Sequence, residues 1–447
     1  MAPHPPAVVI SVRRIGLLGS INFTSQLSFD IFFLPNTSIH TNNTPFELVF
    51  AIRCESVYID GMKNNCSRKI ILIRHGELAK PGGPLRCVSD TDYPLTDYGR
   101  LEAAKTAIWL RENAYDKATI VSSPLTRCVE TAGIISAEFG RKGEDIRICE
   151  NIREISCGHW ENMTFDDIRK QYPEEFEARG KAFSTYEIPG GENFVNAGRR
   201  FGKALAELTD EIAGDIIVVA HAGVFRGFLM ELPLEERVDL YEYHGPDSLF
   251  AIPQPYAGIT ILNDKLEIEL LGYKPLSHLD NYAIDYFYEQ NNVPAHIIKH
   301  MNAVADYQDV LLDRLESHDM HFNRELLHKA AVLHDIRRLD YKHAYAGAKY
   351  IRGEGYAELA SLIANHHEAL SVNGRPSGSD DPLTEADILY YVDKRVQEDK
   401  LVTIEKRFAD SRHKIHGQEA EAAFQAQLDR SYAIEKSLRE ILGDEMI

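Results

Sequence analysis

The chain has 447 residues, of which 44% are hydrophobic and 26% are charged, and this is enough material for two or three globular domains. Its formal net charge of −19 argues against nucleic acid as the main partner, because a polyanion would be repelled, but a phosphorylated small molecule can still bind in a locally positive pocket. No apolar run reaches the roughly 18 residues that span a membrane, and the six cysteines include no C-x-x-C pair. We therefore expect a cytoplasmic protein with reduced thiols and no membrane contact.

The first 61 residues differ from the rest of the chain. They contain no lysine and few charges, and they are rich in Asn, Ser, Thr and Pro. Met62, by contrast, opens a stretch that leads straight into the first expected strand. We therefore interpret residues 1–61 as a poorly ordered N-terminal extension and regard Met62 as a candidate for the native start.

Residues 62–265 alternate between short apolar runs and amphipathic segments. The expected strands are residues 69–74, 118–122, 215–220 and 258–262, and the expected helices are residues 97–111 and 199–212. In the second helix, Phe201, Leu205 and Leu208 lie on one apolar stripe. Alternation of this kind predicts an α/β domain with a mostly parallel sheet.

The remainder of the chain has a helical pattern without strand candidates. Residues 266–292 are a connector rich in Tyr, Asp and Asn. The expected helices after it are residues 294–316, 323–337, 341–353, 355–370, 384–399 and 417–442. We predict an all-α domain over residues 293–410. The C-terminal helix, within residues 411–447, is expected to pack on that domain or to pair two subunits as a homodimer.

Polar side chains follow three of the expected strands in the α/β domain. Arg74 and His75 end the first strand, Arg127 follows the second, and His221 ends the third. Ligands of open parallel sheets bind beyond the carboxyl ends of the strands, so we expect these side chains to converge.

Two arginines and two histidines together suggest a phosphoryl site. Arginine offers a bidentate fork to phosphate oxygens, and an imidazole nitrogen can attack phosphorus and hold it as phosphohistidine. The second imidazole can donate hydrogen bonds to the oxygens in the transition state. Gly76 is expected to let the backbone approach the ligand closely. Each residue alone is more often structural, but four of them at three strand ends favour function.

This part of the chain resembles the histidine phosphatase superfamily, which includes phosphoglycerate mutase and α-ribazole phosphatase. The matching segments, in the family's order, are "RHGE" at 74–77, "YPLTDYG" at 93–99, "SSPLTRCVETA" at 122–132, "REISCGHWEN" at 153–162, "PGGEN" at 189–193 and "AHAG" at 220–223. The resemblance implies a three-layer α/β fold like that of phosphoglycerate mutase and chemistry that needs no cofactor.

The same resemblance assigns roles to individual residues. It implies that His75 is the nucleophile, that Arg74, Arg127 and His221 complete the phosphate pocket, and that Glu154 gives a proton to the leaving group, a role that needs a carboxyl group with a raised pKa. Asn162 stands where the family usually has Gly, and Asn193 stands where it often has Ser. These two departures leave the substrate open, and the compact length favours a phosphatase over a mutase.

A second group of polar residues lies in the helical part. Nine of the eighteen histidines fall between residues 296 and 367. Together with two aspartates, the candidate ligands are His300, His334, Asp335, His343, His366, His367 and Asp393. Of these, His300, His334, His366 and Asp393 lie on the apolar stripes of their expected helices. A buried unsatisfied polar group costs about 1–3 kcal/mol, and a shared divalent transition metal would satisfy several of them. A single one is more often a hydrogen-bonded core histidine, and the remaining four histidines are expected at the surface or in packing.

The helical part resembles the HD-domain metal-dependent phosphohydrolases. The resemblance implies that His300, His334-Asp335 and Asp393 bind a metal, while His343 and His366 match the extra histidines of members with two metals, and His367 is a further candidate. It does not distinguish among Mn, Fe, Ni, Mg and Zn. Arg337 or Arg338 can take the phosphate-contacting role of the family's "HDIGK" lysine, or both can lie at a solvated helix end.

The two resemblances together predict a bifunctional phosphohydrolase that acts on a small-molecule phosphoester such as a nucleotide or sugar phosphate. In this interpretation both domains hydrolyse phosphoesters, and only the HD domain uses metal. Three alternatives stay open at this point: an HD domain that only senses a nucleotide or metal, a mutase-type phosphoryl transferase, and a scaffold that binds phosphorylated partners.

Overall fold

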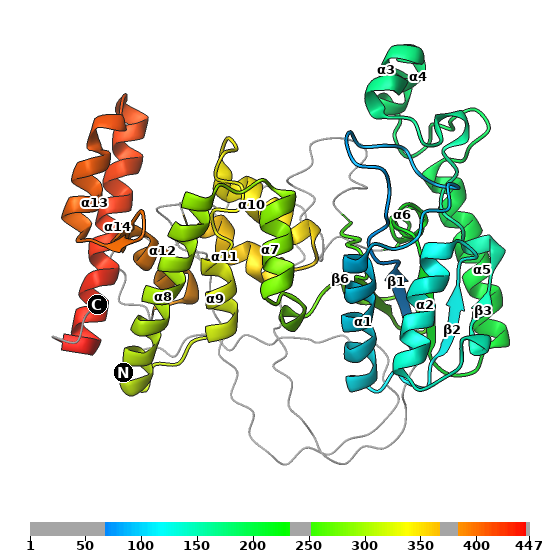
Figure 1. Cartoon of the computed structure of the whole chain (residues 1–447), viewed down its shortest axis with the longest axis horizontal. Coiled ribbons are helices and arrows are strands. Elements are labelled where there is room, and N and C mark those ends of the chain that lie inside the picture. Colours follow the sequence, from blue (N-terminus) through cyan, green and yellow to red (C-terminus); the bar gives the residue numbers. More distant parts are fainter. Residues whose placement is uncertain (1–67, 233–251, 367–382, 444–447) are drawn as a thin grey trace, which may run out of the picture. The chain divides into compact units, whose positions relative to one another are not determined.

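The computed structural model describes residues 68–232, 252–366 and 383–443, and the expected extension of residues 1–61 lies outside them. The first part of the described chain contains a six-stranded sheet in the order β3-β2-β4-β1-β5-β6 (Figure 1). Its strands are β1 (Ile70–Arg74), β2 (Thr119–Ser122), β3 (Arg147–Ile148), β4 (Ile216–Ala220), β5 (Ile259–Leu262) and β6 (Ile268–Tyr273). The four predicted strands are thus confirmed within one or two residues at their ends.

The register of the sheet places the strand ends side by side. Strand β4 pairs in parallel with β1 and with β2, so that Arg74 lies opposite Ala220 and Ser122 lies opposite Val219. The residues that follow these strands therefore lie close together, beyond the carboxyl ends of the parallel strands. Strands β1 to β4 are parallel to one another, and β5 pairs antiparallel with both β1 and β6, so only β5 runs in the opposite direction, which confirms the prediction of a mostly parallel sheet.

Helices cover both faces of the sheet, which makes the three layers. On one face, α1 (Asp97–Glu112) and α2 (Thr126–Glu138) pack against Ile71 and Ile73 of β1. On the other face, α5 (Phe194–Glu211) and α6 (Ala222–Leu229) pack against Ile70 and Leu72. Successive strand residues point to opposite faces, so the continuous apolar run of β1 is what a strand buried on both sides requires. Two short helices, α3 (Phe165–Gln171) and α4 (Pro173–Lys181), extend from this domain (Figure 1).

The expected connector contains regular structure. Strand β6 lies past the expected domain boundary at residue 265 and pairs with β5, so the sheet continues to Tyr273. Helix α7 (Asn281–Gln290) follows, and the hydroxyl of Tyr286 on this helix donates a hydrogen bond to Glu77. Strand β6 is an edge strand in which only Ile268 and Gly272 are fully buried. The alternation of Leu266, Ile268 and Leu270 with glutamates was a strand signal that the sequence interpretation overlooked.

The second part of the chain is helical, as predicted, and one apolar core runs through it. Its helices are α8 (Ala295–Ser317), α9 (Arg324–Ala331), α10 (His343–Gly353), α11 (Ala357–Asn365), α12 (Glu385–Arg395), α13 (Ile404–Ser411) and α14 (Gln418–Leu442).

Two expectations for this part are wrong in detail. Helix α9 ends at Ala331 instead of residue 337, because the chain then makes turns in which His334 Nδ1 hydrogen-bonds the Ala331 carbonyl. A short hairpin of β7 (Val396–Gln397) and β8 (Lys400–Leu401) ends helix α12 before the expected residue 399. The prediction that this part of the chain contains no strands is therefore wrong for this hairpin.

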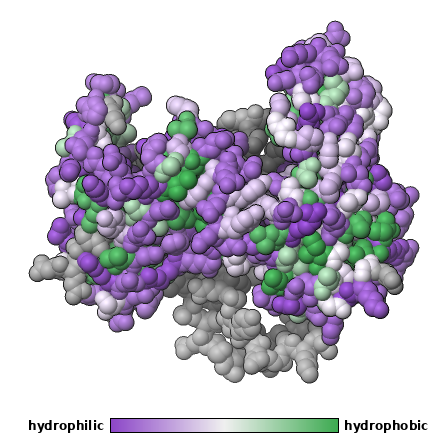
Figure 2. Space-filling model, in the orientation of Figure 1, coloured by the Kyte–Doolittle hydropathy of each residue, from purple (hydrophilic) through white to green (hydrophobic). Residues whose placement is uncertain are grey.

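Hydrophilic side chains dominate the face of the described residues that Figure 2 shows, and hydrophobic ones gather there only in small groups. Among the described helices, none combines the length and the apolar character that crossing a membrane requires.

Gly76 offers a test of how the sheet meets α1. A methyl group added at Gly76 would overlap the carbonyl oxygen of Gly99 in the first turn of α1, whereas one added at Gly82 would meet nothing within 4 Å. We expect Gly76→Ala to lower the free energy of unfolding by about 2 kcal/mol, and Gly82→Ala to change it by less than about 0.5 kcal/mol. Urea denaturation followed by circular dichroism measures both, and equal stabilities would contradict this packing.

Candidate functional sites

The strand ends bring four of the predicted residues together. The imidazole rings of His75 and His221 lie 5.3 Å apart between centroids. Arg127, in the first turn of α2, donates from Nε to His221 Nδ1 over 3.3 Å. Arg74 stacks its guanidinium on the ring of Tyr256 at 3.7 Å and donates to the carbonyl oxygen of Gln254 over 2.7 Å.

His75 is held in one orientation by its own backbone. Its Nδ1 lies 2.7 Å from the carbonyl oxygen of Gly76, so Nδ1 carries the proton and Nε2 keeps its lone pair. The side chain is only 3% exposed. Burial lowers the pKa of His75 well below its usual value, and the charges of Arg74 and Arg127 lower it further. The geometry thus produces a neutral imidazole with a free lone pair beside two cations.

His221 has the opposite tautomer. Its Nδ1 accepts from Arg127, while its Nε2 lies 2.8 Å from the hydroxyl of Ser123. Burial lowers the pKa of His221, and Arg127 and then His75 lower it further, so this ring is also neutral. The sequence interpretation missed Ser123. Its position in "SSP", directly after β2, was a signal that could have identified it.

Arg127 is anchored by a loop that the sequence interpretation did not connect with it. Its Nη2 and Nη1 donate to the carbonyl oxygens of Ser89 and Thr91 over 2.7 Å and 3.1 Å. The carboxylate of Glu161 in turn accepts from the backbone N–H groups of both residues. Contacts between residues 36 to 72 positions apart leave no periodic signal in a single sequence.

Glu154 binds the first turn of α6, the helix that begins directly after His221. Its carboxylate accepts from the backbone N–H of Gly223 over 3.1 Å and of Val224 over 2.9 Å. A methyl group on Gly223 would come within 2.6 Å of Glu154 Oε1, so only glycine lets the carboxylate approach this closely. In this arrangement the carboxylate is an acceptor, and it must take up a proton before it can serve as an acid.

In the helical part, three histidines share one arrangement. The Nδ1 atoms of His300, His334 and His366 lie 2.9, 2.7 and 2.6 Å from backbone carbonyl oxygens, those of Glu398, Ala331 and Ile363 respectively. A backbone carbonyl can only accept, so Nδ1 carries the proton in each ring and Nε2 presents a lone pair. Histidines that bind metals are typically oriented by a second hydrogen bond of this kind.

Those Nε2 atoms face carboxylate oxygens. His300 Nε2 lies 3.1 Å from Asp393 Oδ1, and His334 Nε2 lies 3.6 Å from the same atom and 3.7 Å from Asp335 Oδ2. His334 Nε2 is buried and makes no hydrogen bond within the described part of the chain. Lone pairs that face carboxylates in a buried site call for a cation, and the donor set therefore fits a divalent metal.

The donor atoms form two groups that share one carboxylate. His300, His334 and Asp335 offer atoms within 4.8 Å of one another, and so do Asp335, His343 and His366. Burial would raise the pKa of Asp335, but the neighbouring imidazoles of His334, His343 and His366 outweigh it and hold this pKa far below its usual range. Asp393 lies beside the first group, and predicted ligand His367 lies outside the described residues.

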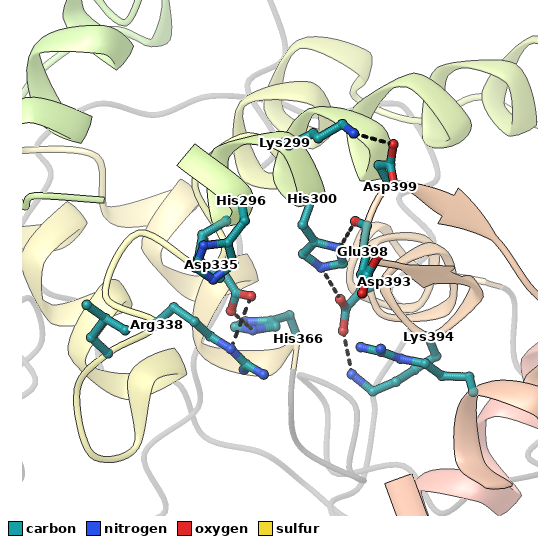
Figure 3. A pocket seen from close by; sticks show the side chains of 13 residues that line it. His296, Lys299, His300, Asp335, Arg338, His366, Asp393, Lys394, Glu398 and Asp399 are labelled. Carbon is teal, nitrogen blue, oxygen red and sulfur yellow. Dashed lines mark hydrogen bonds and ion pairs between the residues drawn. The ribbon is translucent and has the colours of Figure 1, made fainter. Parts of the chain in front are cut away.

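A cavity of about 850 Å³ is lined by four of these residues, His300, Asp335, His366 and Asp393 (Figure 3). Four basic side chains line it, Lys299, Arg338, Lys394 and Arg407, and Lys299 is paired with Asp399. Lys394 Nζ lies 2.5 Å from Asp393 Oδ2, and Arg338 Nε lies 3.6 Å from Asp335 Oδ2, so both cations are beside candidate metal ligands. Arg337 is paired with Asp340 instead, and the geometry therefore favours Arg338 as the residue that could contact a phosphate.

Comparison with known families agrees with this division of the chain. Residues 70–247 match the sequence model of the histidine phosphatase superfamily (branch 1), and residues 297–403 match that of the HD domain. The chain contains both domains.

Similarity to individual proteins is more limited. The 6-phosphofructo-2-kinase/fructose-2,6-bisphosphatase of Gallus gallus is 28% identical over 36% of this chain and 32% of its own length, and that of Arabidopsis thaliana is 30% identical over 38% and 22%. This chain thus spans a third or less of the length of these relatives. Among solved structures, a mycobacterial glucosyl-3-phosphoglycerate phosphatase is 23% identical, with a TM-score of 0.37, over 46% of this chain and 100% of that one.

Three expectations about the histidine phosphatase domain acquire structural explanations. Gly76 is needed for packing against Gly99, and this contact is by itself enough to require a glycine, while the expected approach to a ligand stays a prediction. Asn162 has a φ of 61°, a left-handed conformation that asparagine adopts more readily than most residues, so it can stand where the family has glycine. Asn193 caps α5 by accepting from Asn196 N, a task that serine also performs.

The ionisation of His75 can be measured directly. We expect its ring to remain neutral, with the proton on Nδ1, at pH values near 6.5, where an ordinary imidazole is half protonated. Long-range ¹H–¹⁵N NMR spectra of protein labelled at histidine show this, and the His75→Ala variant identifies the signals. A ring with both nitrogens protonated at pH 6 would contradict the structure.

The metal site of the HD domain is tested by substitutions that distinguish its two groups. Asp335 belongs to both groups, so Asp335→Asn should lower the affinity for divalent metal by at least about tenfold, while His300→Ala and His343→Ala should each affect one group. Inductively coupled plasma mass spectrometry of the purified proteins measures the metal content. His328→Ala, an exposed histidine paired with Asp309, is the matched control. Equal metal content in Asp335→Asn and wild type would rule out this site.

Proposed function

We propose that the chain is a bifunctional phosphohydrolase in which the histidine phosphatase domain removes phosphate from a small phosphomonoester through a phosphohistidine, and the HD domain hydrolyses a phosphoester with bound divalent metal. The observation that supports the first activity most directly is the neutral His75 ring between Arg74 and Arg127. The names of the curated relatives include fructose-2,6-bisphosphatase, which supports a phosphorylated sugar as the class of substrate for this domain.

In the proposed phosphatase reaction, His75 Nε2 attacks phosphorus and the bond between phosphorus and the leaving oxygen breaks. Arg74 and Arg127 hold the phosphate oxygens, and His221 donates a hydrogen bond to them as negative charge builds up. Glu154, once protonated, gives its proton to the leaving oxygen. Water then cleaves the phosphorus–nitrogen bond and releases inorganic phosphate.

In the proposed HD reaction, one set of side chains would bind the metal and a second, basic set would contact the phosphorylated substrate. His300, His334, Asp335, His343 and His366 would hold the metal, with Asp393 beside them. A bound divalent metal supplies a Lewis acid that polarises a phosphoester oxygen. Arg338, Lys394 and Arg407 line the same cavity and neutralise the negative charge of a phosphorylated substrate there.

A panel of phosphoesters assayed with two variants tests this division. His75→Ala should abolish one activity, by about 1,000-fold or more, and leave the other intact, while Asp335→Ala should do the reverse. Only the activity lost in Asp335→Ala should be sensitive to a chelator. The control is His328→Ala.

Two results would count against the proposal. Chelator-insensitive loss of the same activity in both variants would contradict two independent sites. Metal binding without any hydrolysis that depends on Asp335 would instead favour an HD domain that acts as a sensor.

A further inference from the structure

Two cysteines lie close together near the anchor of Arg127. The sulfur atoms of Cys87 and Cys157 are 2.7 Å apart, although the residues are 70 positions apart in the sequence. Both thiols are free and half-buried. Two sulfur atoms in a disulfide are about 2.05 Å apart, so a shift of less than 1 Å would bring these two to bonding distance.

The backbone holds this pair together without help from the sulfur atoms. Cys87 N donates to the carbonyl oxygen of Met163 over 2.9 Å, and Asn162 N donates to the carbonyl oxygen of Cys87. Cys157 N donates to the hydroxyl of Ser89 over 2.9 Å. Because these bonds flank both cysteines, the loop that contains Cys87 and the loop that contains Cys157 are already aligned side by side.

We propose that Cys87 and Cys157 are a reversible disulfide site that reacts with low-molecular-weight disulfides such as oxidised glutathione. The proposal does not depend on either proposed hydrolytic activity. The cross-link would join the loop of Ser89, whose carbonyl oxygen accepts from Arg127, to the loop of Glu161, which accepts from Ser89. The thiol–disulfide state of this pair would therefore set how firmly the Arg127 anchor is held.

The reaction is an exchange of thiols and disulfides. The thiolate of Cys87 attacks one sulfur of oxidised glutathione, a mixed disulfide forms, and one reduced glutathione leaves. The thiolate of Cys157 then attacks the sulfur of Cys87 and expels the second glutathione. Two protein thiols are oxidised and one disulfide of glutathione is reduced.

The environment favours Cys87 as the first nucleophile. The hydrogen bond between the two thiols lowers the pKa of Cys87 and raises that of Cys157. Arg179 lowers the pKa of Cys87 further, against the opposing effect of burial. Cys128, in contrast, is fully buried, and burial raises its pKa above the usual range, so it should stay reduced.

The experiment is peptide mass mapping of the full-length protein after incubation with oxidised glutathione and alkylation of the remaining thiols. We expect one cross-linked peptide pair, two hydrogen atoms lighter than its reduced parts, that joins Cys87 to Cys157. It should disappear with dithiothreitol and in Cys87→Ser and Cys157→Ser. It should persist in Cys149→Ser, which removes a half-buried cysteine outside the pair.

Hydrogen exchange gives a second measurement. In wild type, oxidation should slow amide exchange in residues 86–91 by at least about fivefold, and Cys157→Ser should show no such change. Cys87 and Cys157 that carry separate glutathione or alkyl groups, or a cross-link from either one to Cys149, would overturn the proposal. Because the wild-type mass map alone decides this, a variant that fails to fold does not affect the outcome.

Discussion

The hydrogen bond between His75 Nδ1 and the carbonyl oxygen of Gly76 is the constraint on which the phosphatase site depends. It assigns the proton to one ring nitrogen and leaves the other as a nucleophile. The residue that supplies this carbonyl must be glycine, because its backbone lies against Gly99 at the start of α1. The packing of one helix start therefore determines the chemistry of one imidazole.

The HD domain uses the same device for a different purpose. Backbone carbonyl oxygens again accept hydrogen bonds from Nδ1, this time of three histidines. The Nε2 atoms of these rings therefore keep their lone pairs for a shared ligand. The charges around the two sites are opposite. Two guanidinium groups surround His75 and favour an anionic ligand, while Asp335 and Asp393 face His334 and favour a cation. Similar imidazoles thus gain different functions from the charges of their neighbours.

The sequence predicted the elements that have a strong periodic or motif signal. The four strands, the set of candidate metal ligands and the convergence of Arg74, His75 and His221 followed from patterns within short segments and from the family resemblances. Ser123, Gln254 and the Glu161 loop were missed, because their contacts depend on which distant segments fold together. Strand β6 was missed although Ile268 and Leu270 alternate with glutamates, a signal that was available in the sequence. The early end of α9 was missed because it depends on a histidine side chain that bonds the backbone three residues before it.

The central claim is that Nε2 of His75 receives the phosphoryl group. Rapid acid-free quenching of the enzyme with a ³²P-labelled phosphomonoester, followed by peptide mapping and separation of the two phosphohistidine isomers, tests it most directly. The structure predicts transient label on His75, attached at Nε2, and none in the His75→Ala variant. Label at Nδ1, or hydrolysis that continues in the variant without any phosphohistidine, would contradict it.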